Sequence, residues 1–459
     1  MTATGGRAAG ADKAPLLMAG LIVFNLWHLL GGPVAAFWGI ALSATGFVWL
    51  ARSAIPASIA RICAALVLIG LVVWPFGGAG LHSITRGVYI GAMIASVMAS
   101  VSLLARAAQR SPGLQTVTGY LSVLTYRRRY LMLAAASQVF PCLLGFAGVH
   151  MLFGVASRGA HAGETERLAL FTAITRSFSA ATLWSPTFGN MVILLALYPQ
   201  LRWSQVLPIG LSFAAATIVL SLFVDRRVFL RHHDQADEPP PPGVVRASVR
   251  VLGSMLAFFA VVVAVSLRLE IPVSGAIAML APAVALGLHG YFNVFESGDR
   301  TAAGAWRRFA TDAAALRGFA PEVLLFMAAG CGGSVIADSV PPAWIAYAVG
   351  LLAGHAALAI LALMLCIILL SCVGLHPVLT VVLLASTFTP QALGLPVLPH
   401  FCALLTGWGI ASVVAPFSML NMTAARYSGL APYQISMRQN WQFGVVAVVV
   451  ATLGLSLLA

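Results

Sequence analysis

Long apolar runs follow one another along almost the whole chain, with short polar connections between them. They lie at residues 14–31, 34–51, 62–76, 87–105, 130–155, 168–199, 205–224, 251–267, 271–290, 322–338, 342–371, 375–389, 398–425 and 440–459. A membrane-spanning helix needs about 20 apolar residues. Only 8% of the residues are charged, against about 25% in soluble domains. The sequence therefore predicts an all-α polytopic membrane protein and excludes a soluble enzyme, a disordered chain and a nucleic-acid-binding module.

The positive charge lies in the connections between these runs. The formal net charge is +13, and Lys13 is the only lysine among 26 basic residues. Two clusters are formed by Arg106, Arg110, Arg127, Arg128 and Arg129, and by Arg226, Arg227, Arg231, Arg246 and Arg250. Cytoplasmic loops of membrane proteins are rich in basic residues. We therefore expect both clusters on the cytoplasmic side of the inner (plasma) membrane, and no nucleic-acid partner.

The sequence carries no motif for metal or nucleotide chemistry. All six cysteines lie inside apolar runs, without the CxxC or Cys/His spacing of a metal site. A P-loop, an HExxH sequence and a nucleophile elbow are also missing from the sequence. We therefore expect no enzyme activity, no catalytic residue, no transition metal and no cofactor, apart from Na⁺ as a candidate coupling ion.

The run at residues 168–199 is interrupted near its middle by Ser185, Pro186, Thr187 and Asn190. If both arginine clusters are cytoplasmic, an even number of crossings must separate them, yet three runs lie between them. Proline and glycine break helices, and irregular backbone at membrane depth survives only where it is buried or lines a cavity. The sequence therefore predicts a re-entrant hairpin with its tip at residues 185–190.

Two alignments suggest that the two halves of the chain are related. Residues 184–201 match residues 375–392 without a gap, which pairs Pro186 with Pro377, Pro199 with Pro390 and Gln200 with Gln391. A competing match needs one inserted residue and pairs Pro186, Asn190 and Met191 with Pro416, Asn421 and Met422. The first match covers more of the chain and is preferred. Both predict two inverted repeats, each with a re-entrant hairpin and interrupted helices, as is typical of secondary transporters.

A polar, proline-rich segment at residues 234–243 separates the halves. The predicted organisation is N-terminal scaffold helices at 1–129, a first repeat with a hairpin at 130–233, a cytoplasmic linker at 234–250, scaffold helices of the second half at 251–321, and a second repeat with a hairpin and an unwound helix at 322–459. Four arginines within residues 297–317 favour the cytoplasm, whereas inversion favours the opposite face, so the side of that segment stays open.

Polar residues gather in three interrupted segments, residues 182–190, 371–380 and 412–423. Helix N-termini at such breaks attract anions, and free carbonyl groups suit Na⁺. The candidate substrate-binding residues are Ser185, Thr187, Asn190, Gly374, His376, Thr380, Ser418, Asn421 and Thr423. The candidate cation-binding residues are Ser412, Pro416 and Asn421.

Each of these candidates has a structural alternative. The serines and threonines could cap broken helices or bond back to a helix carbonyl, and His376 could be a buried structural histidine instead of an anion ligand or proton carrier. The acids at the ends of runs, Glu270, Glu322 and Asp338, are the only candidates for a proton relay. Their alternative is interfacial anchoring or pairing with a nearby arginine.

Over roughly residues 130–430 the sequence resembles the ion transporter superfamily, and within it the divalent anion:sodium symporters most closely. Proteins of that family have two inverted repeats, each with a hairpin that has a Ser-Asn-Thr tip and with an unwound, Asn-containing helix after it. Residues 185–190 fall at the first tip, residues 371–380 at the second, and residues 407–429 resemble the unwound helix. Neither tip reads Ser-Asn-Thr, and the expected first-half counterpart of the unwound helix, residues 207–223, contains no Pro-Asn stretch.

The resemblance implies an elevator-type homodimer, in which a domain carrying both hairpins moves against a scaffold. We therefore expect secondary active transport of a small anionic solute, a carboxylate or oxyanion, by symport with Na⁺ or H⁺. Its partners would be the anion, the bilayer and a second copy. Two other readings stay open: a membrane-embedded lipid- or glycan-handling protein that uses His376 as a base, and a channel or subunit of a larger transport assembly.

Overall fold

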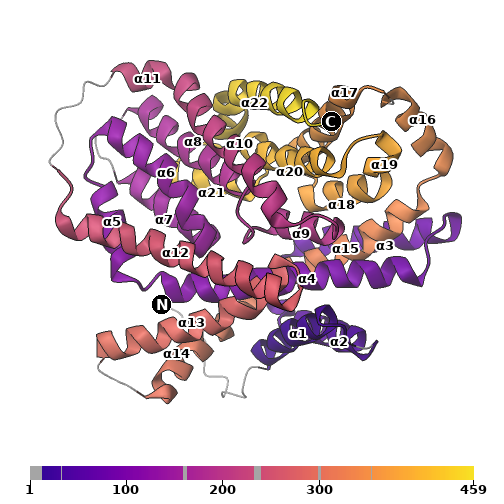
Figure 1. Ribbon diagram of the computed structural model, residues 1–459, viewed down its shortest axis with the longest axis horizontal. Helices are drawn as coiled ribbons and strands as arrows, with labels where there is room; N and C mark the ends of the chain where they lie inside the picture. The colour runs from indigo at the N-terminus through magenta and orange to yellow at the C-terminus, as the bar shows by residue number, and fades with distance from the viewer. Residues whose placement is uncertain (1–12, 33, 159–162, 232–238, 298–300, 353) are drawn as a thin grey trace.

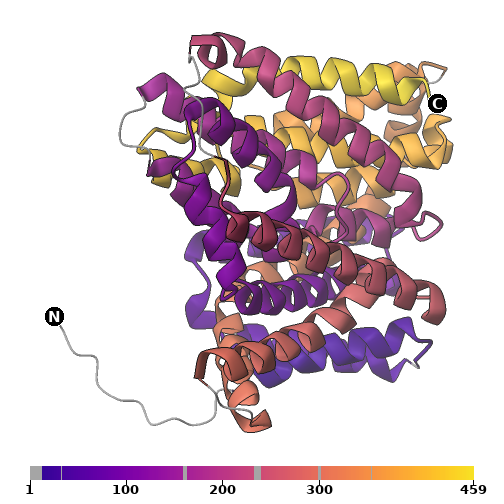
Figure 2. The ribbon, with the colours of Figure 1, turned by 60° about the vertical axis from the view of Figure 1, so that its left-hand side comes forward.

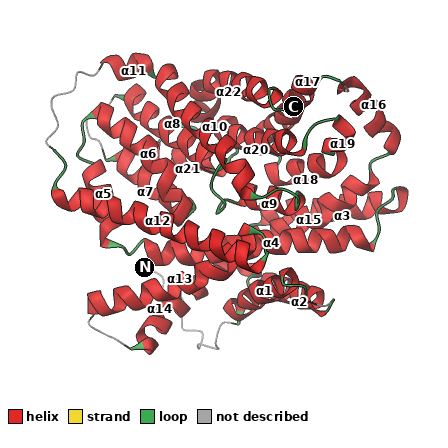
Figure 3. Cartoon of the chain, viewed as in Figure 1, coloured by secondary structure: helices red, strands yellow, loops and turns green. Residues whose placement is uncertain are grey.

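The computed structural model describes residues 13–32, 34–158, 163–231, 239–297, 301–352 and 354–459. Helices account for the regular structure of these residues, and no strand occurs among them (Figure 3). The helices of the first half are α1 (Ala14–Leu29), α2 (Ala35–Leu50), α3 (Ala57–Val73), α4 (Leu81–Ala108), α5 (Pro112–Leu121), α6 (Tyr126–Leu144), α7 (Phe146–Ser157), α8 (Glu164–Ala181), α9 (Gly189–Leu197), α10 (Trp203–Val224) and α11 (Arg226–Arg231).

The second half holds a similar number of helices. They are α12 (Pro242–Leu269), α13 (Val273–Ser297), α14 (Ala302–Ala314), α15 (Ala320–Ser339), α16 (Pro342–Leu352), α17 (Ala356–Cys372), α18 (Pro377–Thr387), α19 (Pro390–Leu393), α20 (Val397–Val414), α21 (Met419–Ser428) and α22 (Gln439–Ser456), with a π-helical turn at Gln434–Arg438.

Six stretches of the described residues are long and apolar enough to cross a membrane. They are Leu81–Ala108, Trp203–Val224, Pro242–Leu269, Val273–Val294, Ala302–Ser339 and Val397–Ser428. Many shorter apolar helices accompany them. The expected all-α polytopic membrane architecture is therefore confirmed.

The helices form two layers (Figures 1 and 2). One layer, at the bottom of both views, is built on α4 and α15, with α1, α2, α3 and α13 packed against them. Glycines allow the close approach of α4 and α15: a Cβ atom on Gly87 would lie 2.4 Å from the carbonyl oxygen of Gly330. Small residues serve this purpose in membrane helix pairs. We call this layer the scaffold.

The other layer contains α6 to α10 and α17 to α22 (Figure 1). Here α8 packs on α6, and α20 packs on α17, while α10 and α22 flank the pair formed by α8 and α20. We call this layer the bundle. It meets the scaffold mainly where α18 packs on α15 and where α9 packs on α4.

The charge count predicts the first hairpin at residues 185–190, but the structure has it elsewhere. Instead α6 and α7 pack against each other, and the chain turns between them at Gly145, with φ +52° and ψ −140°. Only glycine adopts such angles readily. A Cβ atom on Gly148 would lie 2.9 Å from the backbone of Phe140, so this pair of helices also needs a second glycine.

The segment around Pro186 is a broken helix instead of a hairpin. α8 and α9 do not pack on each other as the two arms of a hairpin would: α8 packs mainly on α6, and α9 packs mainly on α4. The expected counterpart of the unwound helix, residues 207–223, belongs to the continuous helix α10. The counterpart of the break between α20 and α21 is therefore the break between α8 and α9. In the second half, α17 and α18 pack together as a hairpin with residues 373–376 at its tip.

Candidate functional site

The two broken helices cross at equivalent positions. The Ser179 hydroxyl on α8 donates to the carbonyl oxygen of Gly409 on α20 at 2.5 Å. Ser179 lies seven residues before Pro186 (186 − 179), and Gly409 lies seven residues before Pro416 (416 − 409). This contact relates the two halves as the competing match does, with Pro186 opposite Pro416. We call residues 182–188 the first break and residues 415–418 the second break.

Each break lies beside the tip of the hairpin that precedes it. In the first half, the Thr187 hydroxyl donates to the carbonyl oxygen of Cys142, at the end of α6, at 2.9 Å. In the second half, a Cβ atom on Gly374 would lie 3.7 Å from the ring of Phe417. The helices that follow the breaks also contact the opposite half, since α9 packs on α20 and α21 packs on α8. The three predicted segments thus meet in one region of the bundle.

The first break is closed by its own hydrogen bonds. The Ser185 and Thr187 hydroxyl groups lie 2.9 Å apart and within hydrogen-bond distance, and both residues are buried. The indole of Trp203 donates to the carbonyl oxygen of Trp184 at 2.7 Å, and the indole of Trp184 donates to Gln138 at 3.0 Å. Ser185 and Thr187 therefore hold the break against the first hairpin.

Asn190 differs from these residues because its side chain is buried in the first turn of α9 without a hydrogen-bond partner among the described residues. Its position at a helix N-terminus, where backbone N–H groups are free, suits a negatively charged oxygen atom.

Asn421 organises the second break. Its amide nitrogen donates to the carbonyl oxygens of Val413 at 2.7 Å, Ala415 at 3.0 Å and Ser412 at 3.3 Å. These carbonyl groups are left free where α20 ends. The carbonyl oxygen of the Asn421 side chain is buried and has no partner among the described residues. This oxygen is therefore available as an acceptor for a ligand.

The predicted cation-binding residues are partly used in other ways. The Ser412 hydroxyl bonds back to the carbonyl oxygen of Trp408 at 3.0 Å, and Pro416 lies within the second break. The Ser418 hydroxyl accepts from the backbone N–H of Asn421 at 3.1 Å and caps α21. Thr423 is buried on the same helix.

The tip of the second hairpin is exposed. Gly374 has φ +96°, and His376 is exposed and caps α18 by accepting the backbone N–H of Val378 at 3.2 Å. His376 therefore has a structural role as the cap of α18, although its side chain is exposed. Thr380, one turn into α18, is buried, and its hydroxyl has no partner among the described residues. Phe417 of the second break is 63% exposed, so this side of the site is open.

The sequence analysis missed the largest buried charge. Arg176 on α8 is 0% exposed, and its guanidinium bonds to Asp225 at 3.0 Å, to the side chain of Asn440 at 2.6 Å and to the carbonyl oxygen of Gln439 at 3.3 Å. The Tyr130 hydroxyl donates to the same carboxylate oxygen of Asp225 at 2.8 Å. The signal was present in the sequence, since Arg176 lies inside an apolar run, where a charge is expensive.

This cluster links the first broken helix to the C-terminal part of the chain. Asn440 also donates to the carbonyl oxygen of Ile435 in the π-helical turn at 3.0 Å. Asp225 lies just beyond the apolar stretch of α10, and burial raises the pKa of its carboxyl group, while the Arg176 guanidinium opposes that shift. Because the second oxygen of Asp225 is buried and without a partner in the described structure, the cluster is not fully satisfied.

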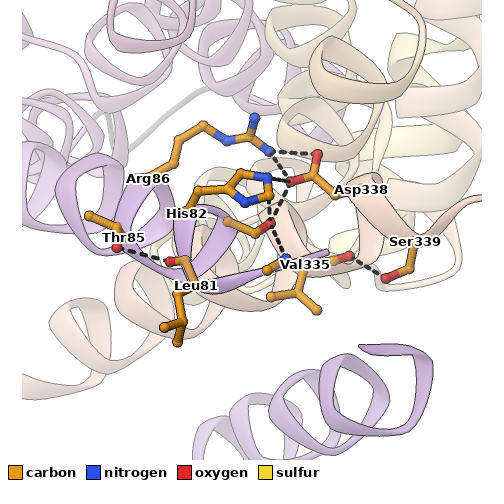
Figure 4. A network of polar contacts seen from close by, with 9 residues as sticks. Leu81, His82, Thr85, Arg86, Val335, Asp338 and Ser339 are labelled. Carbon is orange, nitrogen blue, oxygen red and sulfur yellow. Dashed lines mark hydrogen bonds and ion pairs between the residues drawn. The ribbon is translucent and has the colours of Figure 1, made fainter. Parts of the chain in front are cut away.

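The three acids considered for a proton relay lie away from the breaks. Asp338, at the end of α15, accepts from Arg86 at 2.9 Å and from Ser83 at 2.6 Å, and lies 3.5 Å from His82 (Figure 4). It ties the start of α4 to the end of α15. Glu270 follows the end of α12 with φ 55°, and Glu322 opens α15. The described residues contain no group of His, Cys, Asp and Glu side chains that could hold a metal ion.

The fold is similar to that of a known transporter. It matches the crystal structure of the Alcanivorax borkumensis YdaH transporter with a TM-score of 0.50 and 16% sequence identity, over 79% of this chain and 84% of that chain. No protein-family model and no curated protein sequence matches the chain. At this identity the similarity establishes the fold, so the chain has the fold of a polytopic membrane transporter. The resemblance to divalent anion:sodium symporters stays a prediction.

Proposed function

We propose that this membrane protein is a secondary active transporter of a small anionic solute, a carboxylate or oxyanion, which binds between the two breaks. The observation that carries the proposal is the crossing of α8 and α20 at Ser179 and Gly409, with a break seven residues further along each helix. Broken helices related by internal symmetry form the substrate sites of many transporters.

The residues around the breaks support the proposal that the substrate is an anion. Residues 182–190, 371–380 and 412–423 contain no aspartate or glutamate. Three helices begin here, α9, α18 and α21, and the free N–H groups of helix N-termini favour negative charge. The unpartnered amide of Asn190 and the unpartnered hydroxyl of Thr380 supply further polar contacts.

The difference in exposure between the two breaks supports alternating access. The first break is buried, whereas Gly374, His376 and Phe417 are exposed on the side of the second break. A site that is open at one half and closed at the other is what a transporter needs in one of its two end states. By the same proposal, the bundle moves against the scaffold as an elevator within a homodimer in the inner membrane.

The coupling ion would be Na⁺ or H⁺. The buried side-chain oxygen of Asn421 is the acceptor that a Na⁺ ion would use, whereas His376 at the exposed tip is the group that a proton would use. The nitrogen of Asn421 already occupies the carbonyl groups of residues 412, 413 and 415, which leaves few oxygen ligands for a metal ion.

Uptake into proteoliposomes tests the proposal. Labelled dicarboxylates, tricarboxylates, sulfate and phosphate would be supplied under an imposed Na⁺ gradient, an imposed pH gradient, or neither. We expect one anion to accumulate only with one of the gradients, and we expect Asn190→Ala to lower this uptake at least tenfold.

Asn25→Ala is the matched control, because Asn25 is a buried asparagine on scaffold helix α1, distant in sequence from the breaks. It should leave uptake unchanged. Gradient-independent leakage of all the anions would favour a channel, and the absence of any uptake or anion-dependent rise in melting temperature would overturn the proposal.

A further inference from the structure

An apolar groove lies between α10, α20, α22 and α8, and it reaches the first break at Leu183. Its volume is about 410 Å³. Its walls are mainly leucine, phenylalanine, valine and alanine side chains, among them Phe213, Leu220, Ile410 and Phe443. The only polar side chains along it are the hydroxyl residues Ser179, Thr217 and Thr406. Since the Ser179 hydroxyl already donates to Gly409, the groove offers little to a polar solute.

The groove opens on an exposed apolar surface, as expected of a surface that faces the bilayer. α10 is one of the helices long and apolar enough to span the membrane, and most of its side chains are not buried within the chain. Val219 and Phe223 line the groove and are 67% and 61% exposed. A ligand could therefore enter sideways from the lipid phase without crossing a polar barrier.

One end of the groove carries positive charge. The Arg226 guanidinium, at the start of α11, lies 4.9 Å from the centre of the Phe223 ring. Such stacking holds a cation at the edge of an apolar surface. Arg227 follows it, and both side chains are exposed and have no carboxylate partner among the described residues. The basic-loop rule places this end at the cytoplasmic leaflet, whose lipids include anionic headgroups.

We propose that this groove binds one acyl chain of an anionic phospholipid, with its phosphate held by Arg226 and Arg227. The apolar walls suit the chain, the sideways opening suits entry from the bilayer, and the arginines at one end suit the phosphate. A second copy of this chain is a less suitable occupant, because its surface would have to supply both an apolar ridge and an anionic group at the same spacing.

Native mass spectrometry of the whole protein in detergent tests the proposal. Phosphatidylglycerol and phosphatidylcholine with identical acyl chains would be added separately. Each basic residue near an anionic headgroup contributes about a fivefold preference, so we expect phosphatidylglycerol to be retained at least tenfold better. Arg226→Gln combined with Arg227→Gln should remove that preference, whereas Arg202→Gln, an exposed arginine at the opposite end of α10, should keep it.

Thr217→Trp tests the groove itself, because the indole would fill its middle. It should lower the retention of both lipids at least fivefold while the melting temperature of the lipid-free protein stays within a few degrees. Equal retention of the two lipids, retention that survives Thr217→Trp, or a dimer that excludes lipid from the groove would overturn the proposal.

Discussion

Asn190 and Asn421 follow the two breaks at matching places, but their amides are used differently. The Asn421 amide nitrogen satisfies three carbonyl groups, whereas the Asn190 amide has no partner in the described structure. We expect Asn421→Ala to lower the free energy of unfolding by about 1–3 kcal/mol, since it leaves buried carbonyl groups unpaired. Asn190→Ala should leave that free energy almost unchanged. Equilibrium unfolding in detergent measures both, and equal losses would contradict the assignment.

The buried pair of Arg176 and Asp225 leads to a second expectation at the same scale. Removing one partner of a buried ion pair costs about 3–5 kcal/mol, because the other charge is left unpaired. Arg176→Met and Asp225→Leu should each lower the free energy of unfolding by this amount, and the double variant should lose less than the sum. The partly exposed pair of Arg86 and Asp338 is the control (Figure 4), where Arg86→Met should cost no more than about 1 kcal/mol. If the double variant lost the sum of the two single losses in free energy of unfolding, Arg176 and Asp225 would not be energetically coupled.

Single residues could be found from the sequence when they were unusual for their surroundings. Asn190 and Asn421 stand out as polar residues in apolar runs, and Arg176 could have been found by the same reasoning. Its partners could not, because Tyr130 of α6, Asp225 at the end of α10 and Asn440 of α22 are brought together only by the tertiary fold. The exposure of His376 could not be predicted from the neighbouring sequence either.

At the scale of helices, the first hairpin depends on Gly145. Its angles, φ +52° and ψ −140°, are open to glycine and cost other residues about 1–3 kcal/mol. We expect Gly145→Ala to lower the free energy of unfolding by that amount and to reduce transport, since the tip supports the first break. Gly119→Ala is the control: Gly119 lies in α5 with open space around its Cα. Equilibrium unfolding of both variants tests this prediction. Equal free energies of unfolding for Gly145→Ala and Gly119→Ala would mean that the turn is not strained.

The interrupted helices were predictable, whereas their pairing was not. Proline, glycine and asparagine within apolar runs correctly marked the breaks near Pro186 and Pro416. The count of crossings then placed the first hairpin at the wrong one of two breaks, because a turn at a single glycine leaves no gap in hydropathy between α6 and α7. The shorter alignment was the informative one, since Ser179 and Gly409 meet at equivalent distances from the paired prolines.

At the scale of the whole molecule, a disulfide between the bundle and the scaffold tests the proposed movement of one against the other. A Cβ atom on Gly333 of α15 would lie 3.5 Å from that of Val382 of α18, within the range that a disulfide needs. In a background without the six native cysteines, Gly333→Cys with Val382→Cys should abolish uptake under oxidation, and a reductant should restore it.

The control pair lies within the scaffold. Cβ atoms at Gly70 of α3 and Val335 of α15 would be 4.0 Å apart, and cross-linking these positions should leave uptake intact. Uptake that continues after complete cross-linking of positions 333 and 382 would rule out movement between the two layers. The sequence could predict that such layers exist but not that α15, from the predicted second repeat, lies along α4.

The unequal exposure of the two breaks has a pharmacological consequence. The proposed function requires the exposed residues Gly374, His376 and Phe417 to face water, so a membrane-impermeant compound would reach them from that side, whereas Ser185 and Thr187 are buried. Inhibitors selected against this conformation would therefore be sided: they would act from one face of a vesicle and have no effect from the other. The orientation of the protein in a reconstituted membrane could then be read from the fraction of uptake that such a compound blocks.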